Sequence, residues 1–299
     1  FRPTRGVCKE CERRIRTSQR HQAAPTAPTP PQPSKATPPQ YVLPAPGRPS
    51  ERWPSKNPVE HPGERSHLHR VLFVPDCHVP NHDERAFGLL TRVAAVWRPE
   101  TLVLLGDFLD GESLSLHEPD APSERDFESE LDGVRGCLDQ LDALGAAEKI
   151  YICGNHEDRL ARFLARRAPA LYRSMNIPTL LKLKETGWTW VPYRKSVRVG
   201  KLNLTHDTGT AGMNAHRASS KAFGGSAVIG HTHRMAYEVT GRFDGSPYLS
   251  AMFGWLGDAN VAAKYLHEAK ASDWVHGFGM GYMEPSGVVH VVPVPIVAG

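Results

Sequence analysis

Long apolar segments and abundant cysteines are both missing from this chain of 299 residues, of which 40% are hydrophobic and 23% charged. No apolar run approaches the roughly 18 residues that a helix needs to cross a bilayer, so we expect no membrane partner. The five cysteines are odd in number and widely spaced, which argues against a disulfide framework and favours a reducing compartment. We therefore expect a cytoplasmic protein with enough apolar residues for a sizeable core.

Proline is plentiful but unevenly distributed. Thirteen of the 26 prolines lie between Gln22 and Pro62, among Ala, Thr, Ser and Gln residues. This composition favours polyproline II and cannot bury apolar surface. It predicts a flexible linker over residues 22–65, which separates a short segment, residues 1–21, from one main domain, residues 66–299.

The excess of positive charge is confined to the segment before this linker. Its first twenty residues carry seven basic and two acidic side chains, whereas the net charge of the whole chain is only +4. Such a segment favours polyanions such as DNA or RNA. Cys8 and Cys11 supply half of the ligands of a four-cysteine zinc site, and His21 could supply a third donor. Two interpretations stay open here, a structural zinc site and a disordered basic tail.

Five polar motifs each follow a run of residues typical of a buried strand. The strands are predicted over 71–74, 101–105, 149–153, 201–204 and 227–229, and the motifs are Asp76-Cys77-His78, Gly106-Asp107-Phe108-Leu109-Asp110, Gly154-Asn155-His156-Glu157, Thr205-His206-Asp207 and Gly230-His231-Thr232-His233. Strands that alternate with helices place such loops at one edge of a sheet. Carboxylate, amide and imidazole groups should therefore meet at that edge.

Helices are predicted between these strands. Asp83 can cap one of them, and the helix after the third motif should turn Leu160, Phe163 and Leu164 toward the core. Farther along, the pattern becomes rich in strands, and Gly200-Lys201 and Asp244-Gly245 indicate hairpin turns. The alternation followed by antiparallel segments predicts an α/β protein.

The order of the five motifs and the residues in each resemble those of the calcineurin-like metallophosphoesterase superfamily, and the resemblance extends from about His69 to Ile296. The small phage and bacterial phosphoesterases are the most similar group, so we expect a protein of a bacterium or a phage-infected host cell. The resemblance implies a four-layer sandwich in which two facing mixed β-sheets are flanked by helices. Separately, residues 1–16 resemble the second half of the small zinc ribbons of phage and endonuclease-associated proteins, whose first cysteine pair would lie upstream of Phe1.

The resemblance implies two divalent transition metal ions. Asp76, His78 and His233 are expected to hold one ion, Asn155, His206 and His231 the other, and Asp107 to bridge both. Oxygen and imidazole donors without thiolates suit Mn, Fe, Co, Ni or Zn, and we expect Mn. His216 is the alternative to His206 as a metal ligand. We favour His206 because His206 ends a predicted strand.

The resemblance also implies roles in catalysis. His156 would stabilise the transition state or protonate the leaving oxygen, and Asp110 would orient and charge it. A purely hydrogen-bonding role for His156 and a capping role for Asp110 are the alternatives. Arg159 and Arg234 are candidates for holding the phosphate, with structural ion pairs as the alternative.

The residue at position 111, a glycine, bears on whether the substrate is a phosphomonoester or a phosphodiester. Serine/threonine protein phosphatases of the superfamily carry an arginine at this position, which holds the dianion of a phosphomonoester. Its absence and the basic N-terminal segment favour hydrolysis of phosphodiester bonds, in nucleic acid or nucleotides. The alternatives are a broad-specificity phosphomonoesterase and a nucleic-acid-binding accessory protein with a non-catalytic metal centre.

Overall fold

The computed structural model describes residues 67–115, 126–263 and 273–297. The basic segment with Cys8 and Cys11 and the linker over residues 22–65 lie outside the described residues, so the predictions made for them stay predictions. None of the described helices combines the length and the apolar character that crossing a membrane requires.

The first sheet has six strands in the order β11-β10-β1-β2-β3-β4. Its strands are β1 (His69–Val74), β2 (Thr101–Leu104), β3 (Glu148–Ile152), β4 (Trp188–Val191), β10 (Gly277–Met283) and β11 (Val289–Pro295). Strands β1 to β4 are parallel, and β10 runs antiparallel to both of its neighbours. All four residues of β2 are buried, as expected of a parallel strand that is covered on both faces.

The second sheet has five strands in the order β5-β6-β7-β9-β8. Its strands are β5 (Val197–Val199), β6 (Leu202–Thr205), β7 (Ala227–Ile229), β8 (Met235–Gly241) and β9 (Pro247–Phe253). Strands β6, β7 and β9 are parallel, whereas β5 and β8 pair antiparallel with a neighbour. Gly200-Lys201 joins β5 to β6, and the β8–β9 turn contains Asp244-Gly245, so both predicted hairpins are confirmed.

The helices begin and end within the connections between strands. They are α2 (Glu84–Trp97), α3 (Phe127–Asp142), α4 (Asp158–Arg167), α5 (Ile177–Leu180), α6 (Ala215–Phe223) and α7 (Ala259–Ala262), with the 3-10 turns η1 (Glu112–Leu114) and η2 (Pro169–Leu171). Asp83 caps α2 as predicted, since its side chain accepts hydrogen bonds from the backbone of Arg85 and Ala86. Leu160 and Leu164 of α4 are buried, but Phe163 is 39% exposed, so its predicted inward position is wrong. It lies beside the narrow apolar stripe that the other two residues form on this short helix.

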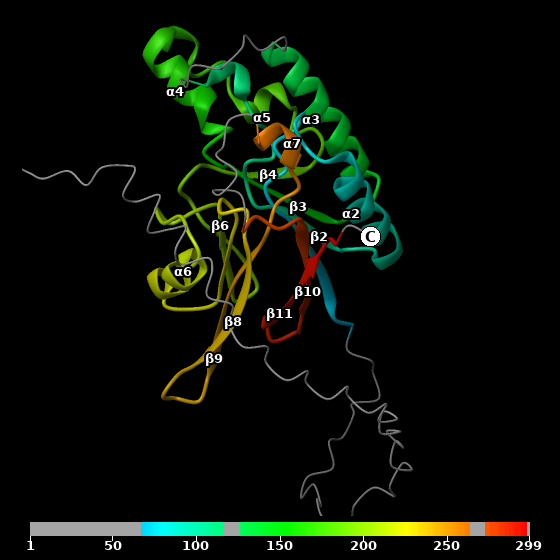
Figure 1. The fold of residues 1–299 in the computed structure, drawn as a ribbon, viewed down its shortest axis with the longest axis vertical. Coiled ribbons are helices and arrows are strands. Elements are labelled where there is room, and N and C mark those ends of the chain that lie inside the picture. The colour runs from blue at the N-terminus through cyan, green and yellow to red at the C-terminus, as the bar shows by residue number, and fades with distance from the viewer. Residues whose placement is uncertain (1–66, 116–125, 264–272, 298–299) are drawn as a thin grey trace, which may run out of the picture. The chain divides into compact units, whose positions relative to one another are not determined.

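Three apolar cores separate four layers. Phe73 and Val103 of the first sheet pack against Leu204 and Phe253 of the second. The outer face of the first sheet packs on α2, α3, α4 and α5, and Ala215 of α6 contacts the outer face of the second sheet. Figure 1 shows α6 on the opposite side of the sheets from α2 and α3. The predicted fold, two facing mixed sheets flanked by helices, is confirmed.

Candidate metal centre

The five motifs lie in the loops that directly follow β1, β2, β3, β6 and β7. The predicted strand ends are confirmed to within one residue. Loops from both sheets meet, because the backbone N–H of His231 donates to the two carboxylate oxygens of Asp76 at 3.0 and 2.9 Å. Nδ1 of His206, after β6, likewise lies 2.9 Å from the carbonyl oxygen of Leu105, after β2. One edge of the sandwich therefore gathers polar side chains that are distant in the sequence.

Four of the expected ligands have left-handed backbone conformations. The φ angles are 56° at His78, 48° at Asp107, 70° at His231 and 58° at His233. Residues other than glycine rarely adopt this conformation, and it is concentrated at functional sites. The strained loops turn the chain sharply after each strand.

Two motif glycines make room for carboxylates. A Cβ atom at Gly230 would lie 2.6 Å from Oδ1 of Asp76, and one at Gly154 would overlap Oδ1 of Asp107. Any larger residue at these positions would displace the acidic side chains. The glycines of these two motifs therefore belong to the packing of the site.

A first donor group consists of Asp76, His78 and His233, whose donor atoms lie within 4.8 Å of one another. The Nε2 atoms of His78 and His233 are 3.0 Å apart, and Nε2 of His233 is 3.2 Å from Oδ2 of Asp76. Burial opposes ionisation of Asp76, yet the hydrogen bond with His233 and the charge of His206 hold its pKa below the usual value. Burial lowers the pKa of His233 to about 4. A neutral imidazole beside a carboxylate is a suitable pair of metal ligands.

A second donor group consists of Asp107, His206 and His231, with Asn155 beside it. Nε2 of His206 is 3.1 Å from Oδ1 of Asn155 and 3.3 Å from Oδ2 of Asp107. Burial alone would lower the pKa of His206, but the carboxylate of Asp107 overcomes this and raises it to about 10. A proton on His206 offsets the negative charges of Asp107 and Asp76. A divalent cation bound at this group would displace that proton.

His216, the competing candidate, lies elsewhere. It is buried in α6, where its Nε2 is 3.7 Å from Oε2 of Glu238. The structure thus places His206, and not His216, among the other donors.

His156 and Asp110 form a hydrogen-bonded pair next to these groups. Nδ1 of His156 is 2.9 Å from Oδ1 of Asp110, which also lies 3.3 Å from Nδ1 of His78. Burial opposes ionisation of Asp110, but its hydrogen bonds with the two histidines lower the pKa of its carboxyl strongly. Arg159 of α4 places an N–H group 3.1 Å from Nε2 of His156 and donates to the carbonyl of Asp110 at 2.9 Å.

The other candidate arginine has different partners. Arg234 forms an ion pair with Asp273 and donates to the carbonyl of Thr232 at 3.3 Å. Of the two candidates, only Arg159 contacts the His156–Asp110 pair among the described residues.

Glu157 organises the loops, a role that the sequence analysis missed although the residue belongs to a predicted motif. Its carboxylate accepts hydrogen bonds from the backbone N–H groups of Asp107, Leu109 and Gly154 at 2.8 to 3.0 Å. The hydroxyl of Tyr151 donates to it at 2.9 Å. Three backbone donors from two loops and one hydroxyl from β3 therefore converge on one buried acid.

Two tryptophans hold the ring of His233, and no motif indicated them. Trp255 stacks on this imidazole with ring centroids 4.9 Å apart and planes 12° apart, and Trp274 meets it edge-on at 4.2 Å. Nδ1 of His233 is buried without a hydrogen-bond partner in the described part of the chain. Ring packing, rather than the usual outer hydrogen bond of a metal-binding histidine, thus sets its orientation.

These residues fit a metal centre by their donor chemistry. Two imidazole nitrogens face each other at 3.0 Å next to a carboxylate in the first group, an arrangement that a shared cation stabilises. The second group adds a carboxylate, an amide oxygen and two further imidazoles. Neither group contains a thiolate. The described cysteines, Cys77, Cys137 and Cys153, are buried elsewhere. Such a mixed oxygen and imidazole set suits first-row transition metals.

Comparisons with known proteins gave the following similarities. No protein-family model matches the chain. The chain is 26% identical over 246 residues to the Gene 54 protein of Mycobacterium phage D29, an alignment that covers 77% of this chain and 94% of the phage protein.

Similar solved structures share little sequence with the chain. Vacuolar Protein Sorting 29 of Cryptosporidium parvum is 13% identical with a TM-score of 0.41, covering 78% of this chain and 100% of that one. Nuclease MPE of Pseudomonas putida is 18% identical with a TM-score of 0.35, covering 74% and 87%. YfcE, a phosphoesterase from E. coli, is 14% identical with a TM-score of 0.34, covering 75% and 99%. The two facing mixed sheets with polar loops at one edge are the architecture that the resemblance of the motifs to the calcineurin-like metallophosphoesterases implies.

Proposed function

We propose that this protein is a metal-dependent hydrolase that cleaves phosphodiester bonds in nucleic acid or nucleotides. The observation that carries the proposal is the convergence of two donor groups and the His156–Asp110 pair at one edge of the sandwich. A catalytic site needs both a place for cations and a group that exchanges protons. This arrangement supports both requirements within one cluster of loops.

The two donor groups would hold two ions, for which Mn is the expected metal. Asp76, His78 and His233 would hold one ion, Asn155, His206 and His231 the other, and Asp107 would contribute to both. When bound, the ions supply charge neutralisation for a phosphate ester and activation of the attacking water.

His156 is suited to transfer the proton. Its Nδ1 is engaged by Asp110 at 2.9 Å, which fixes the ring, and a guanidinium N–H of Arg159 lies 3.1 Å from Nε2. When Arg159 turns to the phosphate of a substrate, Nε2 would be released to give a proton to the leaving oxygen. The positive charge of Arg159 would then stabilise the negative charge that develops on the oxygens of the ester.

A second candidate function, hydrolysis of phosphomonoesters, is favoured by one contact. Arg159 donates to the carbonyl of Gly111 at 3.2 Å, so a guanidinium lies beside the position where protein phosphatases carry their arginine. The basic segment before the linker supports a phosphodiester substrate, because polyanions such as nucleic acids would bind to this segment.

Hydrolysis of four substrates by the Mn-loaded chain tests the proposal. We expect bis(4-nitrophenyl) phosphate and DNA, single- or double-stranded, to be cleaved at least tenfold faster than 4-nitrophenyl phosphate. Arg159→Ala should reduce the rate, whereas Arg166→Ala, an exposed change on the same helix, should not. A preference for the monoester would favour the phosphatase, and no turnover of any substrate would contradict both functions.

A further inference from the structure

A cavity that is open to solvent, with a volume of about 510 Å³, lies between α6 and β8. This volume is in the range of sites for small organic ligands. Its lining residues include Met213, Met235, Tyr237, Met252, His216 and Asp273. None of these six residues belongs to the two donor groups.

The cavity and the donor groups share a wall. Arg234, which lines the cavity, directly follows His233, and Asp273 directly precedes Trp274, whose ring contacts His233. The hydroxyl of Thr232, between the two histidines of the last motif, donates to the sulfur of Met252 at 2.9 Å. A group bound in the cavity would therefore be adjacent to a phosphate at the donor groups.

The charged groups of the cavity neutralise one another. Arg217 is paired with Glu238 and Arg234 with Asp273. Because both guanidinium groups have carboxylate partners, the cavity offers little to a second phosphate or to another anion. Its ligand should be uncharged.

The uncharged part of the wall includes apolar side chains and one amide. Three methionines and the half-exposed Tyr237 provide polarizable surface for a flat ring. The exposed Asn214 also lines the cavity, and its side chain makes no capping hydrogen bond to α6. An amide both donates and accepts hydrogen bonds, so it favours a ligand with a complementary hydrogen-bonding edge. A nucleobase combines a flat ring with such an edge.

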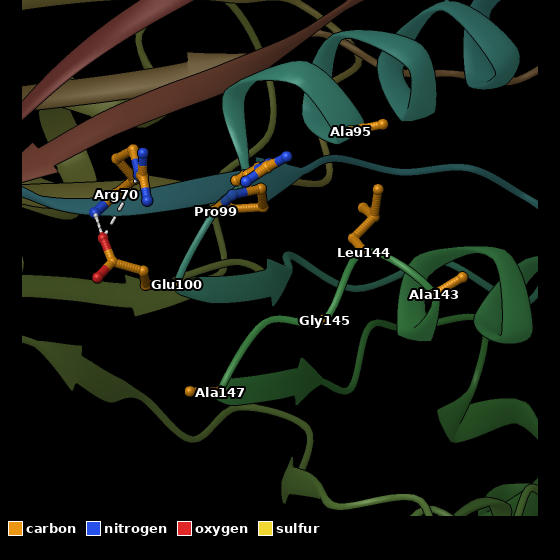
Figure 2. Close-up of a pocket in the computed structure, with 9 residues that line it drawn as sticks. Arg70, Ala95, Pro99, Glu100, Ala143, Leu144, Gly145 and Ala147 are labelled. Atoms are coloured by element: carbon orange, nitrogen blue, oxygen red, sulfur yellow. Dashed lines mark hydrogen bonds and ion pairs between the residues drawn. The ribbon is translucent and has the colours of Figure 1, made fainter.

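A second cavity, of about 410 Å³, provides a contrast (Figure 2). It lies at the amino ends of β1 and β2, the end of these strands opposite to the donor loops. Glu100 accepts a hydrogen bond from the backbone N–H of Arg70 at 3.0 Å and pairs with its Nε at 3.4 Å. No methionine and no residue of the donor groups lines this cavity.

We infer that the cavity between α6 and β8 binds a nucleobase attached beside the scissile phosphate. The inference rests on the proposed function and narrows it to substrates that carry a base. Diesters without a base would be hydrolysed at the metal centre without occupying the cavity.

Methionine methyl groups can report binding in the full chain. Three of the six methionines line the cavity, whereas Met175, Met280 and Met283 do not. With ¹³C-methyl-labelled methionine, we expect AMP or TMP to shift the signals of Met213, Met235 and Met252 and to leave the other three unchanged. Ribose 5-phosphate and inorganic phosphate are the controls. Absence of these shifts, or equal shifts with ribose 5-phosphate, would overturn the inference.

A matched pair of variants tests the same wall. Met235→Ala should weaken binding of AMP about tenfold, at the upper end of what a contact between a methionine sulfur and a ring contributes. Phe243→Ala changes a fully exposed aromatic residue in the turn of the same β8–β9 hairpin and should leave the affinity unchanged. Equal affinities of both variants and the wild type would contradict the assignment of the wall.

Hydrolysis of bis(4-nitrophenyl) phosphate, measured in parallel, separates this inference from the proposed function. Turnover of this base-free diester without methionine shifts would overturn the cavity assignment and leave the proposed function intact. Methionine shifts without turnover of any diester would support the cavity as a base-binding site and contradict the proposed hydrolase.

Discussion

Asp107 and His156 are neighbours, with Nε2 of His156 only 3.9 Å from Oδ2 of Asp107, but their surroundings differ. Asp107 is buried and faces His206 with one oxygen while accepting the backbone N–H of His156 with the other. The side chain of His156 instead pairs with Asp110. Under the proposed function, the first residue would hold a cation and the second would transfer a proton.

Substitution of each should have a distinct effect. Asp107→Asn should weaken metal binding and abolish metal-dependent turnover, because it removes the carboxylate of the second donor group, which the proposed function also assigns to the first ion. His156→Ala should retain the metals and lose ~10²-fold or more in rate, as expected for a positioned proton donor. Elemental analysis and initial rates with Mn measure both effects. Loss of the metals from His156→Ala would contradict its role.

The ring packing around His233 leads to a second prediction. Trp255→Ala should lower the affinity for Mn about tenfold, the lower end of the loss seen when the outer partner of a ligand is removed. Trp255→Phe should restore most of it, since a phenyl ring can still stack. Trp97→Ala, which removes an indole that packs on Tyr282 instead, is the control. Titration of Mn followed by electron paramagnetic resonance gives the affinities, and equal values for Trp255→Ala and wild type would refute the idea.

At the scale of elements, α3 supports the loop after β2. Glu130 of α3 is buried and accepts the backbone N–H groups of Glu112 and Ser113, in η1, at 3.1 and 2.9 Å. The same loop contains Asp107 and Asp110. One helix side chain therefore anchors the segment that leads away from the candidate site.

Glu130→Ala should destabilise the domain by about 2 kcal/mol, because the backbone donors of two partly buried hydrogen bonds lose their acceptor. Glu128→Ala, which removes an exposed ion pair with Arg135 on the same helix, should change stability by less than about 1 kcal/mol. Urea unfolding of both variants measures the difference. Equal losses would show that the contact with η1 is unimportant.

The same carboxyl predicts a dependence on pH. Burial raises the pKa of Glu130 above its usual 4.5, so the folded chain holds this proton more tightly than the unfolded chain. Its contribution to stability is greatest below pH 4.5 and is lost as the pH rises through the raised pKa. Glu130→Gln cannot ionise, so its melting temperature relative to wild type should rise between about pH 4 and about pH 7. A constant difference across this range would contradict the assignment.

The sequence predicts the elements far better than the contacts between them. Apolar runs and adjacent motifs located the strands because both signals are local, and Asp83 was identified as a cap for the same reason. Glu157 contacts a loop 50 residues away and Trp255 packs on His233 from another strand end. No local periodicity indicates such contacts, so the support of the site was visible only in the structure.

At the scale of the whole molecule, the donor groups draw on loops from both sheets. The unfolded chain cannot present these donors together, so bound metal should stabilise only the folded state. Mn should raise the melting temperature of the full chain and EDTA should reverse the rise, whereas Asp107→Asn should show a smaller shift.

Elemental analysis should give two ions in a chain that begins at Ser66. A stoichiometry of one or less would contradict the two-ion assignment.

The segment before the linker should act independently of the main domain. Removal of residues 1–65 should leave hydrolysis of bis(4-nitrophenyl) phosphate unchanged and weaken binding to DNA. The slope of log affinity against log salt should fall by about one for each phosphate that the basic side chains no longer neutralise. Affinities of both chains across a salt series decide this, and identical slopes would identify the segment as a passive tail.

The order of the motifs along the chain has a consequence for its synthesis. Asp76 and His231 are joined by hydrogen bonds although 155 residues separate them. Each of the two donor groups takes a histidine from the last motif, His233 in the first and His231 in the second. While the ribosome is still translating the segment before Gly230, the nascent chain carries five of the seven expected ligands but neither complete group. A premature stop codon anywhere before His231 would therefore yield a product in which both donor groups lack a histidine, rather than one in which one group is intact.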